Sequence, residues 1–214
     1  MDCSSFEKYR HGKHEGRRNH ILDAAFAVFI ENGITNTKME DIARAAGYGK
    51  STLYDYFGSK DEIFSELLRV KFTERYRLIA ASAGKENSPT EKLRAFILGE
   101  LGMIVEYGGK ERLEGMLMAS PETVLSEGFC QAIHDIILFK FHHISAYIKD
   151  GIADGSFERT DPYIAASLVI GASMSYFGTV TSPEYKAVTA GSVTTDEDRL
   201  QSFFTLIFRA LGVG

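Results

Sequence analysis

The residues best suited to chemistry lie between positions 48 and 62, in the stretch YGKSTLYDYFGSKDE. It combines lysine ammonium groups, hydroxyl groups and tyrosine rings, which contact the phosphates and base edges of DNA. One acidic residue, Asp55, lies in the middle of the stretch, and the whole chain has a formal net charge of -5. An acidic chain that binds a polyanion must concentrate its positive charge in one region.

The charge is divided unevenly along the sequence. Residues 8–60 contain nine Lys and Arg against six Asp and Glu, whereas the residues from 61 onward contain fifteen against twenty-one. The basic region therefore coincides with the candidate DNA-binding stretch. Phosphates repel Asp55, but a carboxylate can accept a hydrogen bond from the amino group of cytosine. We interpret Asp55 either as a residue that recognises a specific base or as one whose repulsion of the phosphates is tolerated.

Composition argues against several classes of protein. The two cysteines lie far apart, at positions 3 and 130, and no Cys/His spacing typical of a metal site occurs. We therefore expect no metal, no disulfide and a reducing, cytoplasmic location. The polar N-terminus predicts no signal peptide. Residues 163–182 are uncharged, but their serines, threonines and glycines favour a core or interface helix over a membrane span.

Helix signals dominate the chain. Each of the four prolines follows Ser or Asp, the order of a helix N-cap and first helical residue. Glycines stand where helices should end, and no strand pattern occurs. We predict an all-α fold with an unanchored N-terminus and a loop at 183–195 that can hold one helical turn. The expected helices, about nine, cover roughly 17–32, 38–45, 50–57, 60–82, 89–107, 110–119, 127–152, 162–179 and 196–211.

The first three predicted helices follow the helix-turn-helix pattern. Apolar residues repeat at helical spacing from Ile21 to Phe29, and Gly47 permits a tight turn between two short helices. At about 100° per residue, Leu53 and Phe57 lie on one side of the third helix, opposite its small polar residues. This arrangement suits a helix in a major groove, and an ordinary surface helix is the alternative.

Residues 17–60 resemble the DNA-binding domain of the TetR (tetracycline repressor) family of bacterial transcriptional regulators. Residues 151–166 are similar to a stretch of that family's multidrug-type branch. The resemblance implies a flexible basic arm at 1–14, a helix-turn-helix domain at 15–60 and a helical ligand-binding and dimerisation domain at 61–214. The matching residues are Ile21 to Gly33, then Thr37, Ile42, Ala43, Ala46 and Gly47, then Thr52, Leu53, Tyr54, Phe57, Ser59 and Lys60.

The resemblance implies double-stranded operator DNA as a partner. Two positions depart from the family pattern: Gly49 stands where Ser commonly caps the third helix, and Ser51 stands where Gly is common. The basic residues Lys8, Arg10, Lys13, Arg17 and Arg18 either enter a minor groove or form a solvated tail. The expected DNA-contacting residues are Thr37, Lys38, Lys50, Ser51, Thr52, Tyr54, Tyr56 and Lys60, to which we add Asp55.

The larger domain is dense in aromatic and methionine side chains, most of which must form its core. The resemblance implies that some of them line a pocket for a small lipophilic or aromatic effector. We interpret the histidines at 134, 142 and 143 as ordinary core or surface residues, and expect no cofactor. The candidate pocket residues are Phe96, Met103, Tyr107, Met116, Phe129, Phe139, His142, Tyr147, Met174 and Phe177.

The last two predicted helices, at about 162–179 and 196–211, are poor in charge and could form a homodimer interface around a two-fold axis. We therefore expect a homodimeric, ligand-responsive regulator, most simply a repressor released from a palindromic operator. A DNA-binding regulator without a small effector, constitutive or switched by a protein, is one alternative. A small helical enzyme is the other, and the lack of a catalytic arrangement of residues argues against it.

Overall fold

The computed structural model describes residues 3–106, 126–180 and 183–213, and every regular element in those ranges is helical. The predicted all-α fold is therefore confirmed for the described residues, while the helix expected at 110–119 lies outside them. The chain divides into two compact units. The described residues 3–72 and 126–134 belong to the first unit, and residues 73–106 and 135–213 belong to the second.

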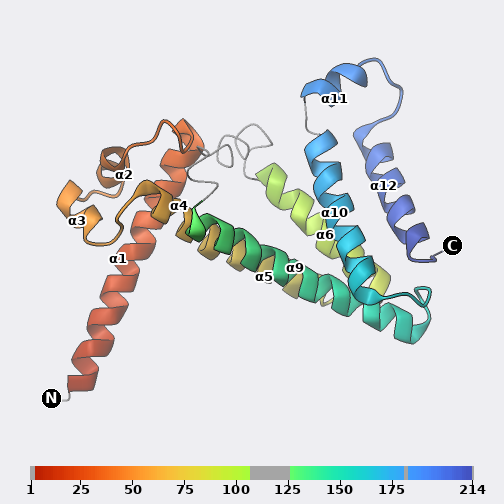
Figure 1. Ribbon diagram of the computed structural model, residues 1–214, viewed down its shortest axis with the longest axis horizontal. Coiled ribbons are helices and arrows are strands. Elements are labelled where there is room, and N and C mark those ends of the chain that lie inside the picture. Colours follow the sequence, from red (N-terminus) through yellow and green to blue (C-terminus); the bar gives the residue numbers. More distant parts are fainter. Residues whose placement is uncertain (1–2, 107–125, 181–182, 214) are drawn as a thin grey trace. The chain divides into compact units, whose positions relative to one another are not determined.

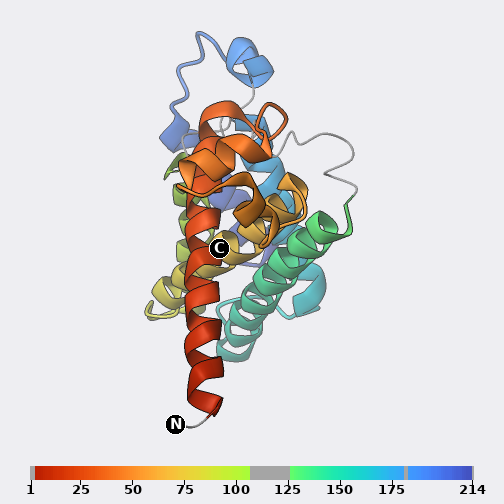
Figure 2. The same ribbon diagram turned by 90° about the vertical axis from the view of Figure 1, so that its left-hand side faces the viewer.

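The first unit contains α1 (Cys3–Asn32), α2 (Met39–Ala45), α3 (Lys50–Tyr54), α4 (Lys60–Leu67) and the π-helical segment η1 (Leu68–Phe72) (Figure 1). α2 lies beside the C-terminal half of α1 (Figure 2), and α3 packs on α2. The prediction that α1 begins near residue 17 is wrong, because the helix begins at Cys3. No proline interrupts residues 3–16, and the two glycines there only weaken a helix.

The core of the first unit is built from large apolar side chains of all four α-helices. Phe29, Leu53, Phe57 and Phe64 are each at most 1% exposed, and the Phe29 and Phe64 rings meet edge to face at 5.6 Å. Burying each such side chain contributes about 1.5–3 kcal/mol. Gly47 has a φ of +69°, which favours glycine and lets the chain turn from α2 into α3.

The helix predicted at 60–82 is interrupted. Between α4 and α5 (Thr73–Ala83), residues Leu68 to Phe72 form the π-helical turn η1. A π-turn inserts one extra residue into a helix, and a 3.6-residue apolar pattern gives no warning of it. The boundary between the two units falls directly after this turn, between Phe72 and Thr73.

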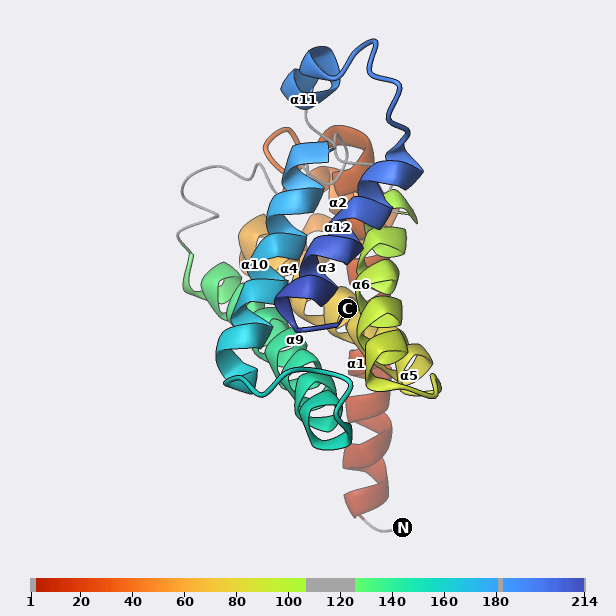
Figure 3. The ribbon, with the colours of Figure 1, turned by 90° about the vertical axis from the view of Figure 1, so that its right-hand side faces the viewer.

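The second unit contains α5, α6 (Pro89–Glu106), most of α9 (Glu127–Asp154), α10 (Pro162–Val180), α11 (Pro183–Val188) and α12 (Asp196–Ala210) (Figure 3). The backbones of α5 and α6 approach closely at Gly99, where an added Cβ would lie 2.7 Å from the Ile79 side chain. Thr195 caps α12 with a capping box. Among the described helices, none is long and apolar enough to span a bilayer.

The two glycines at the C-terminal end of α9, Gly151 inside the helix and Gly155 directly after it, have a packing explanation. Gly155 ends the helix with a φ of +84°, which returns the chain toward its last turn. The Phe157 ring then lies against Gly151, where a Cβ would come within 2.2 Å of a ring carbon. The Phe157 N–H donates to the Gly151 carbonyl at 2.9 Å. The close contact of Phe157 with Gly151 and the turn at Gly155 therefore explain the spacing of these three residues.

Candidate nucleic-acid interface

The short helix α3 presents the side that its sequence predicts. Leu53 is fully buried and Phe57, just beyond the helix, is 1% exposed, so both anchor α3 to the core. Ser51 and Asp55 are exposed, and Thr52 and Tyr56 are half-buried. The helix therefore offers small polar groups outward while its apolar residues fix its rotation.

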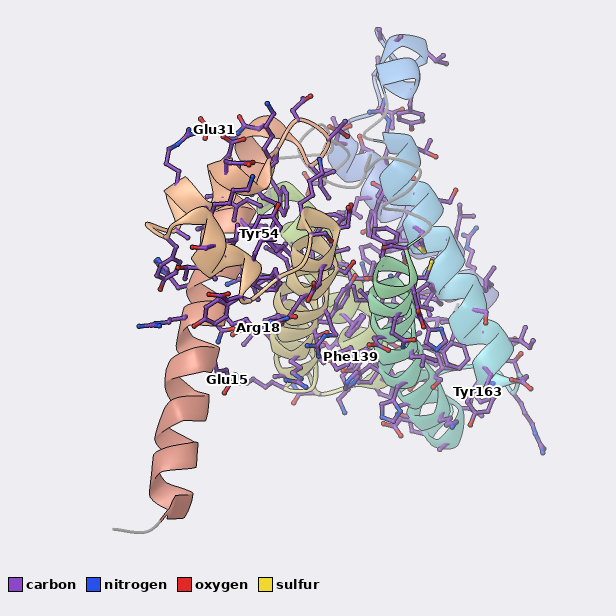
Figure 4. All side chains as sticks on the ribbon, turned by 60° about the vertical axis from the view of Figure 1, so that its left-hand side comes forward. Glu15, Arg18, Glu31, Tyr54, Phe139 and Tyr163 are labelled. Atoms are coloured by element: carbon purple, nitrogen blue, oxygen red, sulfur yellow. The ribbon has the colours of Figure 1, made fainter. Side chains whose placement is uncertain are left out.

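Lys50 and Tyr54, the first and last residues of α3, are both exposed and lie about one helical turn apart. Tyr54, labelled in Figure 4, is 46% exposed, and the Lys50 ammonium is 5.8 Å from the centre of its ring. Lys50 also forms an ion pair with Glu40 of α2. The hydrogen bond between them raises the pKa of Lys50 and lowers the pKa of Glu40. A contact between Lys50 and a phosphate would therefore require its ammonium to exchange Glu40 for that phosphate.

Two predicted contact residues lie at the start of α2, and only one of them is exposed. The Thr37 side chain is buried, and its hydroxyl donates to the Gly33 carbonyl at 2.7 Å. Lys38 is exposed and is the N-cap residue of α2, where its N–H donates to Asp41 Oδ2 at 3.1 Å. The prediction that the Thr37 side chain contacts DNA is therefore not supported, since its hydroxyl holds the end of α1.

Lys60 has an internal role that sequence reasoning missed. Its ammonium donates to the carbonyl oxygens of Ile34, Thr35 and Thr37 at 2.8, 3.1 and 3.1 Å. An ammonium has three donors, so this loop uses all of them. A phosphate contact from Lys60 would require these bonds to break, and we assign Lys60 to the loop between α1 and α2 instead.

Arg18, expected in the basic arm, joins three elements of the first unit (Figure 4). Its Nε donates to Glu66 Oε1 at 2.7 Å, and a second nitrogen pairs with the other oxygen of the same carboxylate. Its Nη1 donates to the Tyr56 carbonyl at 2.6 Å, and its guanidinium lies 4.1 Å from the Phe57 ring centre. The bonds to Glu66 raise the pKa of Arg18 despite its partial burial. Arg18 therefore ties α4 to the segment directly after α3.

Only some of the predicted pocket residues come together. The rings of Phe96, Phe139 and Tyr147 meet around His143 in the second unit, at centroid distances of 6.1, 4.5 and 6.3 Å from it. Met103 is buried two turns after Phe96 on α6, while Phe177 is buried on α10 against Tyr176. The remaining candidates lie elsewhere: Phe129 stacks on Phe64 in the first unit, His142 and Met174 are exposed, and Tyr107 and Met116 lie outside the described residues.

Sequence reasoning also missed a buried polar group in the second unit. Glu100 of α6 and Lys140 of α9 form an ion pair at 2.7 Å, and the Tyr76 hydroxyl donates to the same carboxylate oxygen at 2.8 Å. A signal existed, because Glu100 lies at helical spacing from the apolar Phe96 and Met103. Among the described residues, no group of three metal-ligating side chains occurs.

Comparison with known proteins supports the interpretation of the first unit. Residues 21–67 match the model of the bacterial regulatory proteins of the tetR family. The transcriptional repressor KstR2 of Mycobacterium tuberculosis is 36% identical over 100 residues. That match covers 45% of this chain and 48% of the relative, so it spans about half of the relative's length.

Two solved structures share the fold over most of the chain. FadR from Bacillus subtilis, a transcriptional regulator solved with stearoyl-CoA, matches with a TM-score of 0.66 and 20% identity, over 88% of this chain and 96% of that one. AibR, solved with isovaleryl coenzyme A and operator DNA, matches with a TM-score of 0.61 and 18% identity, over 90% of this chain and 98% of that one. KstR2 is a transcriptional repressor and FadR is a transcriptional regulator.

Proposed function

We propose that this chain is a DNA-binding transcriptional regulator of the TetR family, to which the match of residues 21–67 points, that it represses transcription from a palindromic operator, and that a small lipophilic or aromatic effector releases it. The exposed polar face of α3, held by buried Leu53 and Phe57, is the observation that carries the DNA-binding part. A cytoplasmic location goes with this role. Membership of the multidrug-type branch is not part of the proposal, because KstR2 and FadR lend it no support.

The proposed interface divides into base-reading and phosphate-binding residues. Ser51, Thr52 and Asp55 face outward on or just after α3 and would approach base edges in the major groove. The flanking residues would hold phosphates and so fix the position of the helix on the duplex. They are Lys38, Lys50, Tyr54 and Tyr56.

A homodimer is proposed because a palindromic operator needs two recognition helices. The helices α10 and α12 carry large apolar side chains that are exposed in the single chain: Ile164 and Leu206 are each 69% exposed, and Leu168 is 51% exposed. Covering these faces with the same faces of a second copy would remove them from water. The two α3 helices should then lie about 34–36 Å apart, one turn of DNA.

Effector release is proposed as a shift between two populations of conformations. The aromatic group in the second unit, around His143, is suited to a lipophilic ligand. FadR and AibR, two proteins of similar fold, were solved with acyl-CoA ligands, which supports a ligand-binding role for this domain. An effector that prefers the conformation with altered operator spacing would weaken DNA binding.

Selection of bound duplexes from a randomised pool tests the DNA-binding part. The purified chain should enrich an inverted repeat whose half-sites are centred about 10 base pairs apart, or a multiple of that spacing. Asp55→Asn should change the preferred base at one position of each half-site if the carboxylate reads a cytosine. A pool with no enriched sequence would contradict the proposal, and uniformly tighter binding by Asp55→Asn would show that Asp55 only repels phosphates.

Reciprocity tests the effector part once a ligand and an operator are known. Because the coupling between two sites is mutual, operator DNA should weaken effector binding by the same factor by which the effector weakens DNA binding. Titration calorimetry of the effector with and without the operator duplex measures this factor. Equal effector affinity in both titrations would contradict the switch.

A further inference from the structure

The polar group at Glu100 lies deep in the second unit. The side chains of Glu100 and Lys140 are 2% and 7% exposed, and Tyr76 is 6% exposed. Burial, together with the neighbouring Glu100 carboxylate, raises the pKa of Tyr76 well above its usual value, so its hydroxyl stays protonated and donates. Three helices, α5, α6 and α9, each contribute one side chain to this group.

The hydrogen bonds of Glu100 are unevenly divided between its two oxygens. Oε1 accepts from both the Tyr76 hydroxyl and the Lys140 ammonium. Oε2 is buried and has no hydrogen-bond partner among the described residues. A carboxylate oxygen has two lone pairs, and buried acceptors are almost always satisfied, so this atom calls for a donor.

Stability alone is a weak reason for such a cluster. Replacing a buried ion pair by apolar side chains is often neutral or stabilising. The surroundings are aromatic, because the rings of Phe96 and Phe139 each lie 6.3 Å from the Tyr76 ring, and Met103 follows Glu100 on α6. A polar group set among aromatic rings and an adaptable methionine has the composition of a ligand-orienting site.

We propose that Glu100 Oε2 accepts a hydrogen bond from the effector, which is therefore a neutral, largely apolar ring compound bearing an O–H or N–H group. This inference rests on the proposed function and specifies the chemical class of its ligand. The Glu100–Lys140 pair is already neutral, so an uncharged donor completes it without adding a buried charge. An anionic carboxylate would meet Glu100 itself, and the Tyr76 donor is already used.

Matched probes test the chemical class directly. We would titrate 4-butylphenol, its methyl ether 4-butylanisole and the anion 4-butylbenzoate into the full chain at pH 7, using calorimetry. The phenol should bind about tenfold more tightly than the ether, as one hydrogen bond to a charged acceptor allows. Equal affinities, a preference for the benzoate, or binding by none of the three would overturn the proposal.

An isosteric variant then assigns the preference to Glu100. Glu100→Gln replaces the free acceptor by an N–H donor of the same shape, so the preference should disappear or pass to the ether. The double variant Glu100→Gln/Lys140→Met removes both charges of the buried pair. It replaces the single variant in this test if Glu100→Gln alone melts at a much lower temperature than the unsubstituted chain. Ser173→Ala is the control, because Ser173 Oγ is also buried without a partner among the described residues. Its phenol preference should be unchanged, and an unchanged preference in the Gln variants would overturn the proposal.

DNA release separates this inference from the proposed function. If the phenol binds with the expected preference but leaves operator binding unchanged, the ligand site stands and the proposed switch fails. If operator DNA is released equally by phenol and ether, the switch stands and the role of Glu100 Oε2 fails.

Discussion

Arg18→Met should destabilise the first unit, because it removes every polar contact of the guanidinium while keeping much of the apolar stem. The variant loses the two-point pair with Glu66 and the bond to the Tyr56 carbonyl. The Arg18 and Glu66 side chains are partly shielded from solvent, at 27% and 19% exposure. Glu66 would lose its bidentate ion-pair partner in this position.

The expected loss is about 2 kcal/mol. Breaking a fully buried pair costs about 3–5 kcal/mol, whereas exposed pairs contribute about 0–1 kcal/mol, and this pair lies between the two cases. For a chain of this length, 1 kcal/mol corresponds to a change in Tm of about 2–4 °C, so Tm should fall by about 4–8 °C. Operator binding should weaken as well, since Arg18 holds the segment that directly follows α3.

Urea unfolding followed by circular dichroism measures the change, with Arg17→Met as the matched control. Arg17 is the exposed neighbour of Arg18, and its replacement removes the same charge without breaking the pair with Glu66. The control should stay within about 0.5 kcal/mol of the unsubstituted chain. Equal stability of the two variants would refute the assignment of Arg18 as a structural clamp.

Three further predictions concern Lys60, Glu40 and His143. Lys60→Met should lower the free energy of unfolding in urea by about 1–3 kcal/mol, because three carbonyls lose their donor. The salt dependence of operator binding should stay unchanged. If the slope of log K against log salt concentration became smaller by about one, Lys60 would instead contact a phosphate. Glu40→Gln frees Lys50 from its internal anion, so operator affinity measured by fluorescence anisotropy should rise by about two- to fivefold, whereas a fall would show that the pair positions Lys50 for DNA. Burial lowers the pKa of His143, so protons bind preferentially to the unfolded chain, and the free energy of unfolding should fall as the pH drops from 7.5 to 5.5. The variant His143→Phe should show a smaller fall over the same pH range. If its pH dependence were unchanged, His143 would not be the source of the fall.

The face of α3 could be predicted because it depends only on local periodicity. Leu53 and Phe57 are four residues apart, and the helical angle alone places the polar residues opposite them. The internal roles of Thr37 and Lys60 could not be predicted in this way. A hydroxyl or an ammonium near a helix end has the same sequence signature whether its donors meet DNA or a nearby carbonyl, and the carbonyl of Ile34 is 26 residues from Lys60 in sequence.

The second unit shows the same limit over a longer range. Composition alone predicts that most aromatic side chains of the larger domain, such as Phe96, lie in its core. The pairing of Glu100 with Lys140 joins residues forty positions apart, and it depends on how closely α5, α6 and α9 approach. Gly99, where α6 meets Ile79, allows that approach between α5 and α6, but its effect is visible only once the helices are placed.

Sequence-specific binding through α3 is tested most directly by fluorescence anisotropy with two duplexes, the selected inverted repeat and a scrambled duplex of the same composition and length, at about 0.15 M salt. We predict that the chain binds the selected duplex about a thousandfold or more tightly than the scrambled one. A Thr52→Ala/Asp55→Ala variant should lose most of this difference while its Tm stays close to that of the unsubstituted chain. Equal affinity of the unsubstituted chain for both duplexes would contradict the account.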